Sequence, residues 1–207
     1  MKTGNPIEAP RAASSSFAAV AIACFVLFAF ALLLVHALRP DRALTTTWIS
    51  GYAVGRNGWI MTTAWLVASA GCLMLVLGLI RSGLRSGVAR VAAALLGVLS
   101  IGFLVAAIFP PGPTLSGDIH SIGFLVNVVC ILFSSILLSV ACRRDARWRT
   151  FQRTAVAFAI LLVTMFVLQF ATAYLEVMYG VVNRLFVTVL IMWLLAVSNR
   201  LRTLSSD

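Results

Sequence analysis

Six long apolar runs, separated by short polar links, account for most of this sequence and leave few folds open to it. Because a helix rises about 1.5 Å per residue, roughly 20 apolar residues suffice to cross the hydrocarbon core of a bilayer, which is about 30 Å thick. The runs predict transmembrane helices at residues 16–38, 59–80, 88–109, 119–141, 154–175 and 178–198. We therefore predict an all-α, polytopic integral membrane bundle of six transmembrane helices with short antiparallel connections.

The composition supports a membrane protein rather than a water-soluble one. Of the 207 residues, 61% are hydrophobic and 11% are charged, and the mean hydropathy is +1.03. A soluble domain could not build a polar exterior from this balance. Outside the transmembrane domain (residues 16–199) the prediction leaves only a leader (1–15) and a tail (200–207). The first run exceeds the roughly 7–15 apolar residues of a signal-peptide core, so we expect an uncleaved anchor.

The distribution of basic residues predicts the orientation of the bundle. Twelve of the sixteen fall in the leader, the second and fourth links and the tail, whereas the opposite side holds four. The larger group is Lys2, Arg11, Arg81, Arg85, Arg90, Arg143, Arg144, Arg147, Arg149, Arg153, Arg200 and Arg202, and the smaller is Arg39, Arg42, Arg56 and Arg184. By the positive-inside rule, both termini are expected in the cytoplasm.

The net charge of +10 does not indicate a nucleic-acid partner, because the basic residues form short clusters between apolar spans rather than one basic surface. Arginine supplies fifteen of the sixteen basic residues and alanine many of the apolar ones, a bias typical of a GC-rich bacterial genome. We therefore expect a multi-pass protein of a bacterial inner (plasma) membrane, in contact with membrane lipids.

The sequence holds no pattern typical of a metal or haem site. Its four cysteines form no C-x-x-C pair or other ligand spacing. His36 and His120 are the only histidines, and both lie near the predicted outer surface, whereas a membrane haem is normally held by histidines at mid-depth. A zinc hydrolase would need three or more ligands around one ion. We expect no cofactor and no metal.

Polar side chains collect on the predicted outer side and continue into two helices. The stripes are His120, Asn127 and Ser134 on the fourth span, and Gln169, Thr172 and Glu176 on the fifth. Each set recurs at a spacing that places its members on one helix face. We expect these two faces to lie opposite one another.

Arg184 is the polar residue of the sixth span that most constrains the packing. The uninterrupted apolar run 185–198 is too short to cross the bilayer, so the helix must begin near Met178. Arg184 then lies about 9 Å inside the helix, where an unpaired charge costs up to about 3 kcal/mol or more at full depth. We expect it to face the bundle and to pair with Glu176, Asp118 or Gln169.

These polar residues permit two interpretations. They can be interhelical hydrogen bonds and a structural ion pair, as is frequent in membrane bundles. They can also line a polar cavity at the outer half of the bundle, with Arg184 as an anion or carbonyl anchor and His120 as a proton-handling neighbour. The candidate ligand-binding residues are Arg184, His120, Tyr52, Asn127, Glu176, Gln169 and Asp118.

The predicted outer loops carry a recognisable pattern. It consists of the stretch from Ser50 to Trp59 (SGYAVGRNGW), then Phe109-Pro110 followed by Thr114 and His120, and finally Gly180 and Asn183-Arg184. This pattern resembles the bacterial membrane family known as domain of unknown function 998, over nearly the whole chain. The resemblance implies six transmembrane helices and no known activity. The family often has acidic or glutamine residues where this chain has Gly51, Pro111-Gly112 and Asn183.

Three functions fit these observations. The first is binding or transport of a lipid or small molecule through the outer polar cavity. The second is a membrane-embedded enzyme acting on a lipid-linked substrate, with His120 as acid or base and Arg184 stabilising an anion, although no nucleophile motif supports it. The third is a structural or accessory subunit, as a homo-oligomer or with another membrane protein, because small residues such as Gly97 and Gly102 permit close helix packing. We favour the first, which is not catalytic.

Overall fold

The computed structural model describes residues 8–83 and 86–206, and within these ranges the chain is helical apart from its links and contains no strand. The long helices are α1 (Glu8–Leu38), α2 (Gly58–Arg81), α3 (Gly87–Ile108), α4 (Leu115–Arg144), α5 (Gln152–Tyr174) and α6 (Tyr179–Ser206), with short 3-10 helices η1 (Ile49–Ala53) and η2 (Arg149–Phe151). Lys2 and Arg85, and the first seven residues of the expected leader, lie outside the described residues.

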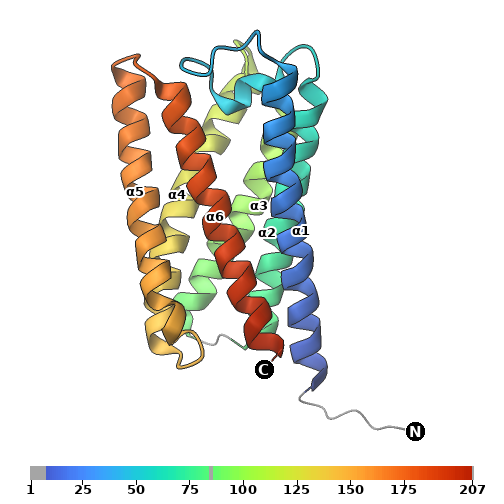
Figure 1. The fold of residues 1–207 in the computed structure, drawn as a ribbon, viewed down its shortest axis with the longest axis vertical. Helices are drawn as coiled ribbons and strands as arrows, with labels where there is room; N and C mark the ends of the chain where they lie inside the picture. Colours follow the sequence, from blue (N-terminus) through green and yellow to red (C-terminus); the bar gives the residue numbers. More distant parts are fainter. Residues whose placement is uncertain (1–7, 84–85, 207) are drawn as a thin grey trace, which may run out of the picture.

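Six of these helices are long and apolar enough to cross a membrane, which confirms the predicted fold class. Each helix packs against its neighbours in sequence, and α6 packs against α1, so that the helices form a closed ring. α1 begins and α6 ends at the same end of the bundle (Figure 1). The protein is therefore an all-α bundle in which the chain runs from one end to the other an even number of times and successive helices are antiparallel.

The helices extend beyond the predicted spans chiefly at three ends. α1 begins at Glu8 rather than at residue 16. α6 continues to Ser206, past the predicted end at residue 198, so most of the expected tail is helical. α4 begins at Leu115 rather than at residue 119. The reason is the same at each of these ends, because polar residues that leave the hydrocarbon can continue a helix whose backbone hydrogen bonds are already made.

The outside of the bundle is apolar. Large side chains such as Phe30, Leu33 and Ile122 are more than half exposed, as expected for surfaces that contact lipid. α5 is the extreme case, since only 22% of its apolar window is buried. It packs against α4 and α6 and contributes Gln169 and Leu162 to the interior.

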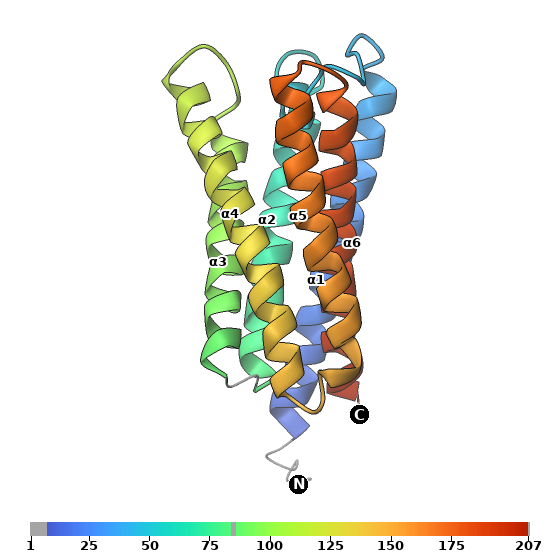
Figure 2. The same cartoon turned by 90° about the vertical axis from the view of Figure 1, so that its left-hand side faces the viewer.

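The two ends of the bundle differ in structure and charge. One end, which we call the η1 end, comprises residues 39–57, 109–114 and 175–178 with the first turns of α6, and it carries Arg39, Arg42, Arg56 and Arg184. The other end carries the arginines at positions 81, 90, 143, 144, 147, 149, 153, 200 and 202. Near the η1 end, α3 and α4 diverge from α5 and α6 (Figure 2).

The link between α1 and α2 folds onto the η1 end and is held there by Arg39. The Arg39 guanidinium, which is 5% exposed, donates to both carboxylate oxygens of Asp41 and to the carbonyls of Val54 and Arg56. Gly55 has a φ of +86°, a conformation that strongly favours glycine. Ile49 and Tyr52 of η1 point into the bundle and are buried.

Candidate functional site

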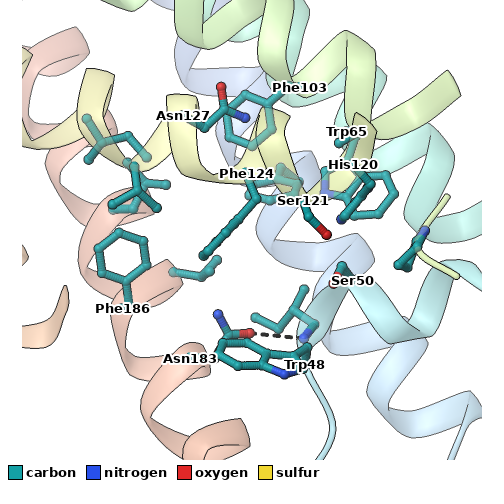
Figure 3. A pocket seen from close by; sticks show the side chains of 18 residues that line it. Trp48, Ser50, Trp65, Phe103, His120, Ser121, Phe124, Asn127, Asn183 and Phe186 are labelled. Carbon is teal, nitrogen blue, oxygen red and sulfur yellow. Dashed lines mark hydrogen bonds between the residues drawn. The ribbon is translucent and has the colours of Figure 1, made fainter. Parts of the chain in front are cut away.

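A cavity of about 340 Å³ lies inside the bundle near the η1 end (Figure 3). Its walls come from every long helix except α5, and η1 with the preceding Trp48 contributes to them. Six aromatic side chains line it: Phe28, Trp48, Trp65, Phe103, Phe124 and Phe186. Five polar residues join them, namely Ser50, His120, Ser121, Asn127 and Asn183. Such a mixture of aromatic walls and a few polar groups is typical of small-molecule sites.

η1 is fixed over the cavity by a buried chain of amides. The Ile49 N–H donates to Asn183 Oδ1, and Asn183 Nδ2 donates to Gln169 Oε1, both at 3.0 Å. These bonds join η1 to α6 and α6 to α5, and they fix the orientation of the Asn183 amide. Gln169 Nε2 is buried and finds no acceptor among the residues that the structure describes. Asn183 and Gln169 therefore position the η1 side of the cavity.

His120 lies on the α4 wall, against Trp65 of α2 (Figure 3). Its Nδ1 is 2.9 Å from the carbonyl oxygen of Phe109, so Nδ1 carries the proton and donates it. In the neutral imidazole Nε2 then has a free lone pair. The ring is 8% exposed, and the residue lines the cavity, so Nε2 is available to accept a hydrogen bond from a ligand.

Asn127 lies two turns further along the same face of α4 and packs against Gly102 of α3. A Cβ atom at Gly102 would overlap the Asn127 amide, so glycine is required for this approach of the two helices. Asn127 Oδ1 is buried and has no hydrogen-bond donor within residues 8–83 and 86–206. An unsatisfied buried oxygen of this kind is unusual. Because Asn127 is also a lining residue, its amide nitrogen is a candidate donor to a ligand or water in the cavity.

The cavity is partly open. Its lining residues that are exposed or half-buried lie on several elements: Trp48, Ser50, Ala106, Pro111, Ser121, Phe124 and Val187. The other lining residues are buried. α5 contributes no lining residue.

Arg184 belongs to a separate cluster on the other side of α6, and it is not among the residues that line the cavity. Its Nε donates to His36 Nε2 at 2.8 Å, and its Nη2 donates to the Tyr52 hydroxyl at 3.0 Å. Nη1 donates to the carbonyls of Leu44, Thr47 and Gly180 at 2.6–2.9 Å. The guanidinium also lies 5.6 Å from the centre of the Tyr52 ring. These bonds join α6 to α1 and to the α1–α2 link.

Arg184 therefore faces the bundle and is paired, as expected, but its partners are neutral rather than acidic. The expected carboxylates Asp118 and Glu176 are exposed and form no ion pair in the described part of the chain. α5 ends at Tyr174, and Glu176 adopts a left-handed φ of +56° in the link, so the predicted stripe does not extend to it. Gln169, the third expected partner, bonds to Asn183 instead.

The structure thus divides the predicted site residues into three groups. His120 and Asn127 line the cavity, and with Ser134 they occupy one buried face of α4, as their spacing predicts. Arg184, Tyr52 and the hydrogen-bonded Gln169 support the cavity or the helix contacts around it without lining it. The remaining two, Asp118 and Glu176, lie on the surface.

Sequence reasoning missed most of the cavity wall, because its aromatic residues do not differ from lipid-facing ones in the sequence. Trp65, Phe103 and Phe186 are buried, while Trp59 and Phe30 are exposed. Asn183 could have been identified from the sequence, because it is an amide residue next to Arg184 inside an apolar span. The described residues contain no group of three or more His, Cys, Asp or Glu side chains that could hold a metal ion.

A comparison with known families relates the whole bundle to other proteins. The family model described as "Protein of unknown function (DUF998)" matches residues 22–200, which include most of α1 and all of α2 to α5. No curated protein and no solved structure matches the chain. Since the match covers most of the chain, and since both the predicted loop pattern and the six-helix bundle agree with it, the protein belongs to the DUF998 family.

Proposed function

We propose that this protein binds a lipid or other amphiphilic small molecule in the cavity near the η1 end, and that it presents or transports this molecule in the outer half of the membrane. The observation that carries the proposal is the cavity itself. Its volume, about 340 Å³, is within the roughly 300–1,000 Å³ typical of ligand sites. His120 and Asn127 place polar atoms without protein partners on one wall of it.

The apolar surface beside part of the cavity wall favours a ligand that arrives from the bilayer. Three of the seven partly exposed lining residues, Ser121, Phe124 and Val187, lie on α4 and α6, and the adjacent surface of α5 is almost wholly apolar. A molecule that partitions into lipid can enter here without crossing a charged rim. A soluble, charged ligand would lose its hydration along this apolar route.

The proposal includes an orientation and a membrane. The η1 end carries four arginines, and the opposite end carries Arg11 and nine others in the described ranges, so the positive-inside rule assigns the η1 end to the outer side. Both termini then lie in the cytoplasm. The arginine-rich composition supports a bacterial plasma membrane as the location.

The cluster around Arg184 has a different role in this proposal. Its donors are occupied by side chains and carbonyls that are far apart in the sequence, as in a structural joint. The structural interpretation of the polar residues therefore applies to Arg184, His36 and Tyr52, and the cavity interpretation to His120 and Asn127.

The proposal is tested by filling the cavity. Ala106 lines it, and Ala106→Leu should abolish a lipid adduct that native mass spectrometry detects on gently extracted wild-type protein. Ala157→Leu is the matched control, because Ala157 lies exposed on α5. Loss of the adduct in the first variant alone supports the proposal. Absence of any adduct on the wild type, or its survival in folded Ala106→Leu protein, contradicts it.

A further inference from the structure

We propose that the ligand of this cavity is an uncharged amphiphile whose head is a hydroxyl or carbonyl group, rather than a lipid with a charged head. This inference rests on the proposed function and deepens it by naming the ligand class. Among the lining residues only His120 can titrate, and no Arg, Lys, Asp or Glu is present. An ion moved into such a site would lose its hydration without gaining a counter-ion.

The nearby charges are not available to a ligand. Arg184 donates to five protein acceptors in all, namely three backbone carbonyls, His36 and Tyr52. Arg39 is occupied by Asp41 and two carbonyls, and Asp118 and Glu176 are exposed and do not line the cavity. An anionic head would therefore have to break the joint between α6 and α1 to reach a guanidinium.

The free polar atoms of the wall match a neutral head group. His120 Nε2 is an acceptor, because Nδ1 is used as the donor to Phe109. Asn127 Oδ1 is buried against Gly102, which leaves the amide nitrogen of Asn127 as a donor for the cavity. A hydroxyl can donate to His120, and a hydroxyl or carbonyl oxygen can accept from Asn127. The two residues are seven positions apart on α4, about 10 Å along the helix.

The remaining wall suits the apolar body of such a molecule. Phe28, Phe103 and Phe186, together with Val128, Ile131 and Leu190, are lining residues deeper in the bundle and are buried. Aromatic rings can also hold an organic cation by cation–π attraction. A cationic head is therefore the competing ligand class, which the experiment must include.

The test is a competition between amphiphiles that share an oleyl chain. Wild-type protein in detergent is mixed with equal amounts of 1-monooleoylglycerol (neutral), oleoyl lysophosphatidic acid (anionic) and oleyl trimethylammonium (cationic), and native mass spectrometry measures the bound fraction of each. We expect the neutral ligand to exceed each charged one by about tenfold, the equivalent of one net hydrogen bond. A second neutral probe, geranylgeraniol, distinguishes a prenol from a glycerolipid source.

Two variants test the role of the polar atoms independently, so that a failure of one to fold leaves the other to decide. His120→Phe and Asn127→Leu should each weaken monooleoylglycerol binding by about tenfold while the charged probes stay unchanged. A preference for either charged probe, or equal binding of all three, overturns the neutral class but leaves the proposed function in place. The absence of any bound probe on folded wild-type protein overturns both.

Discussion

Arg184 Nε on α6 donates a 2.8 Å hydrogen bond to His36 Nε2 on α1, across 148 positions of the sequence. Because His36 Nδ1 is bonded to the Leu32 carbonyl, Nε2 is the nitrogen left to accept. The two rings of His36 and Tyr52 also pack together, with their centroids 4.6 Å apart. The first and last helices are thus joined through a cation whose partners are all neutral.

This joint predicts that Arg184→Gln destabilises the bundle more than loss of another arginine at the same end. Removing Arg184 leaves His36, Tyr52 and three carbonyls without their donor, and hydrogen bonds to charged groups contribute about 1.5–3 kcal/mol each. We expect a lower Tm in detergent for Arg184→Gln. Arg56→Gln, at an exposed position, is the control and should melt like the wild type. Equal melting of both variants would contradict the structural role.

Gly180 predicts a second point of sensitivity at the η1 end. A Cβ atom there would lie 2.5 Å from the carbonyl oxygen of Leu44 and 2.9 Å from that of Thr45, and both neighbours are backbone. Gly180→Ala should therefore destabilise the protein by about 1–3 kcal/mol, as overpacking does in well-packed interiors. Gly112→Ala, whose Cβ would meet no atom within 4 Å, is the control. Unfolding in detergent with increasing denaturant measures both, and an unchanged midpoint for Gly180→Ala would show that the link can move.

Gly102 gives a way to alter the cavity without changing a residue that lines it. Alanine at this position would overlap the Asn127 amide and push it toward the cavity. We expect Gly102→Ala to reduce monooleoylglycerol binding by about tenfold, since one hydrogen bond and part of the volume are lost. Gly97→Ala on the same helix meets nothing within 4 Å and should leave binding intact. Full binding by the Gly102 variant would mean that Asn127 does not face the ligand.

Asp41 predicts a pH dependence at the η1 end. The Arg39 guanidinium, which donates to both oxygens of Asp41, holds the pKa of that carboxyl below its ordinary value. A lowered folded-state pKa stabilises the fold above the unfolded pKa of about 3.9, and this contribution is lost as the pH falls through the lower, folded value.

The corresponding experiment compares melting temperatures between about pH 6 and pH 3 for the wild type and two variants. Asp41→Asn should reduce the loss of stability in acid, because the titrating group is gone. Asp118→Asn should lose stability in acid to the same extent as the wild type, because Asp118 forms no salt bridge in the described ranges. An identical acid profile for all three proteins would show that the Arg39 pair does not contribute to the pH dependence.

The orientation can be tested with one cysteine at each end. Thr46 and Thr150 are both exposed, on the η1 end and on the opposite end respectively. We expect a membrane-impermeant maleimide to label Thr46→Cys in intact cells and Thr150→Cys only after permeabilisation. The wild type is the control, because its four cysteines lie within the membrane spans and three of them are buried. The reverse labelling pattern would place the cavity on the cytoplasmic side.

The six spans, the start of α6 near Met178 and the buried face shared by His120, Asn127 and Ser134 could all be predicted from the sequence. These features depend on local quantities: the length of an apolar run, the length of helix needed to cross a bilayer and the periodicity of an α-helix. The same reasoning correctly placed Arg184 facing the interior, since a charge facing lipid is costly.

The partners of these residues could not be predicted in the same way. The expected ion pair with Glu176 or Asp118 was replaced by neutral acceptors on α1 and the α1–α2 link, and most of the cavity wall was missed. Helix periodicity says which residues share a face, but the rotation and tilt of each helix against its neighbours depend on packing over the whole ring. The sequence by itself determined a six-helix membrane bundle, because lipid leaves the backbone no other way to satisfy its hydrogen bonds in these apolar runs. Only the tertiary structure decided that Arg184 joins helices while His120 and Asn127 face a cavity, because that division depends on which side chains meet across the bundle.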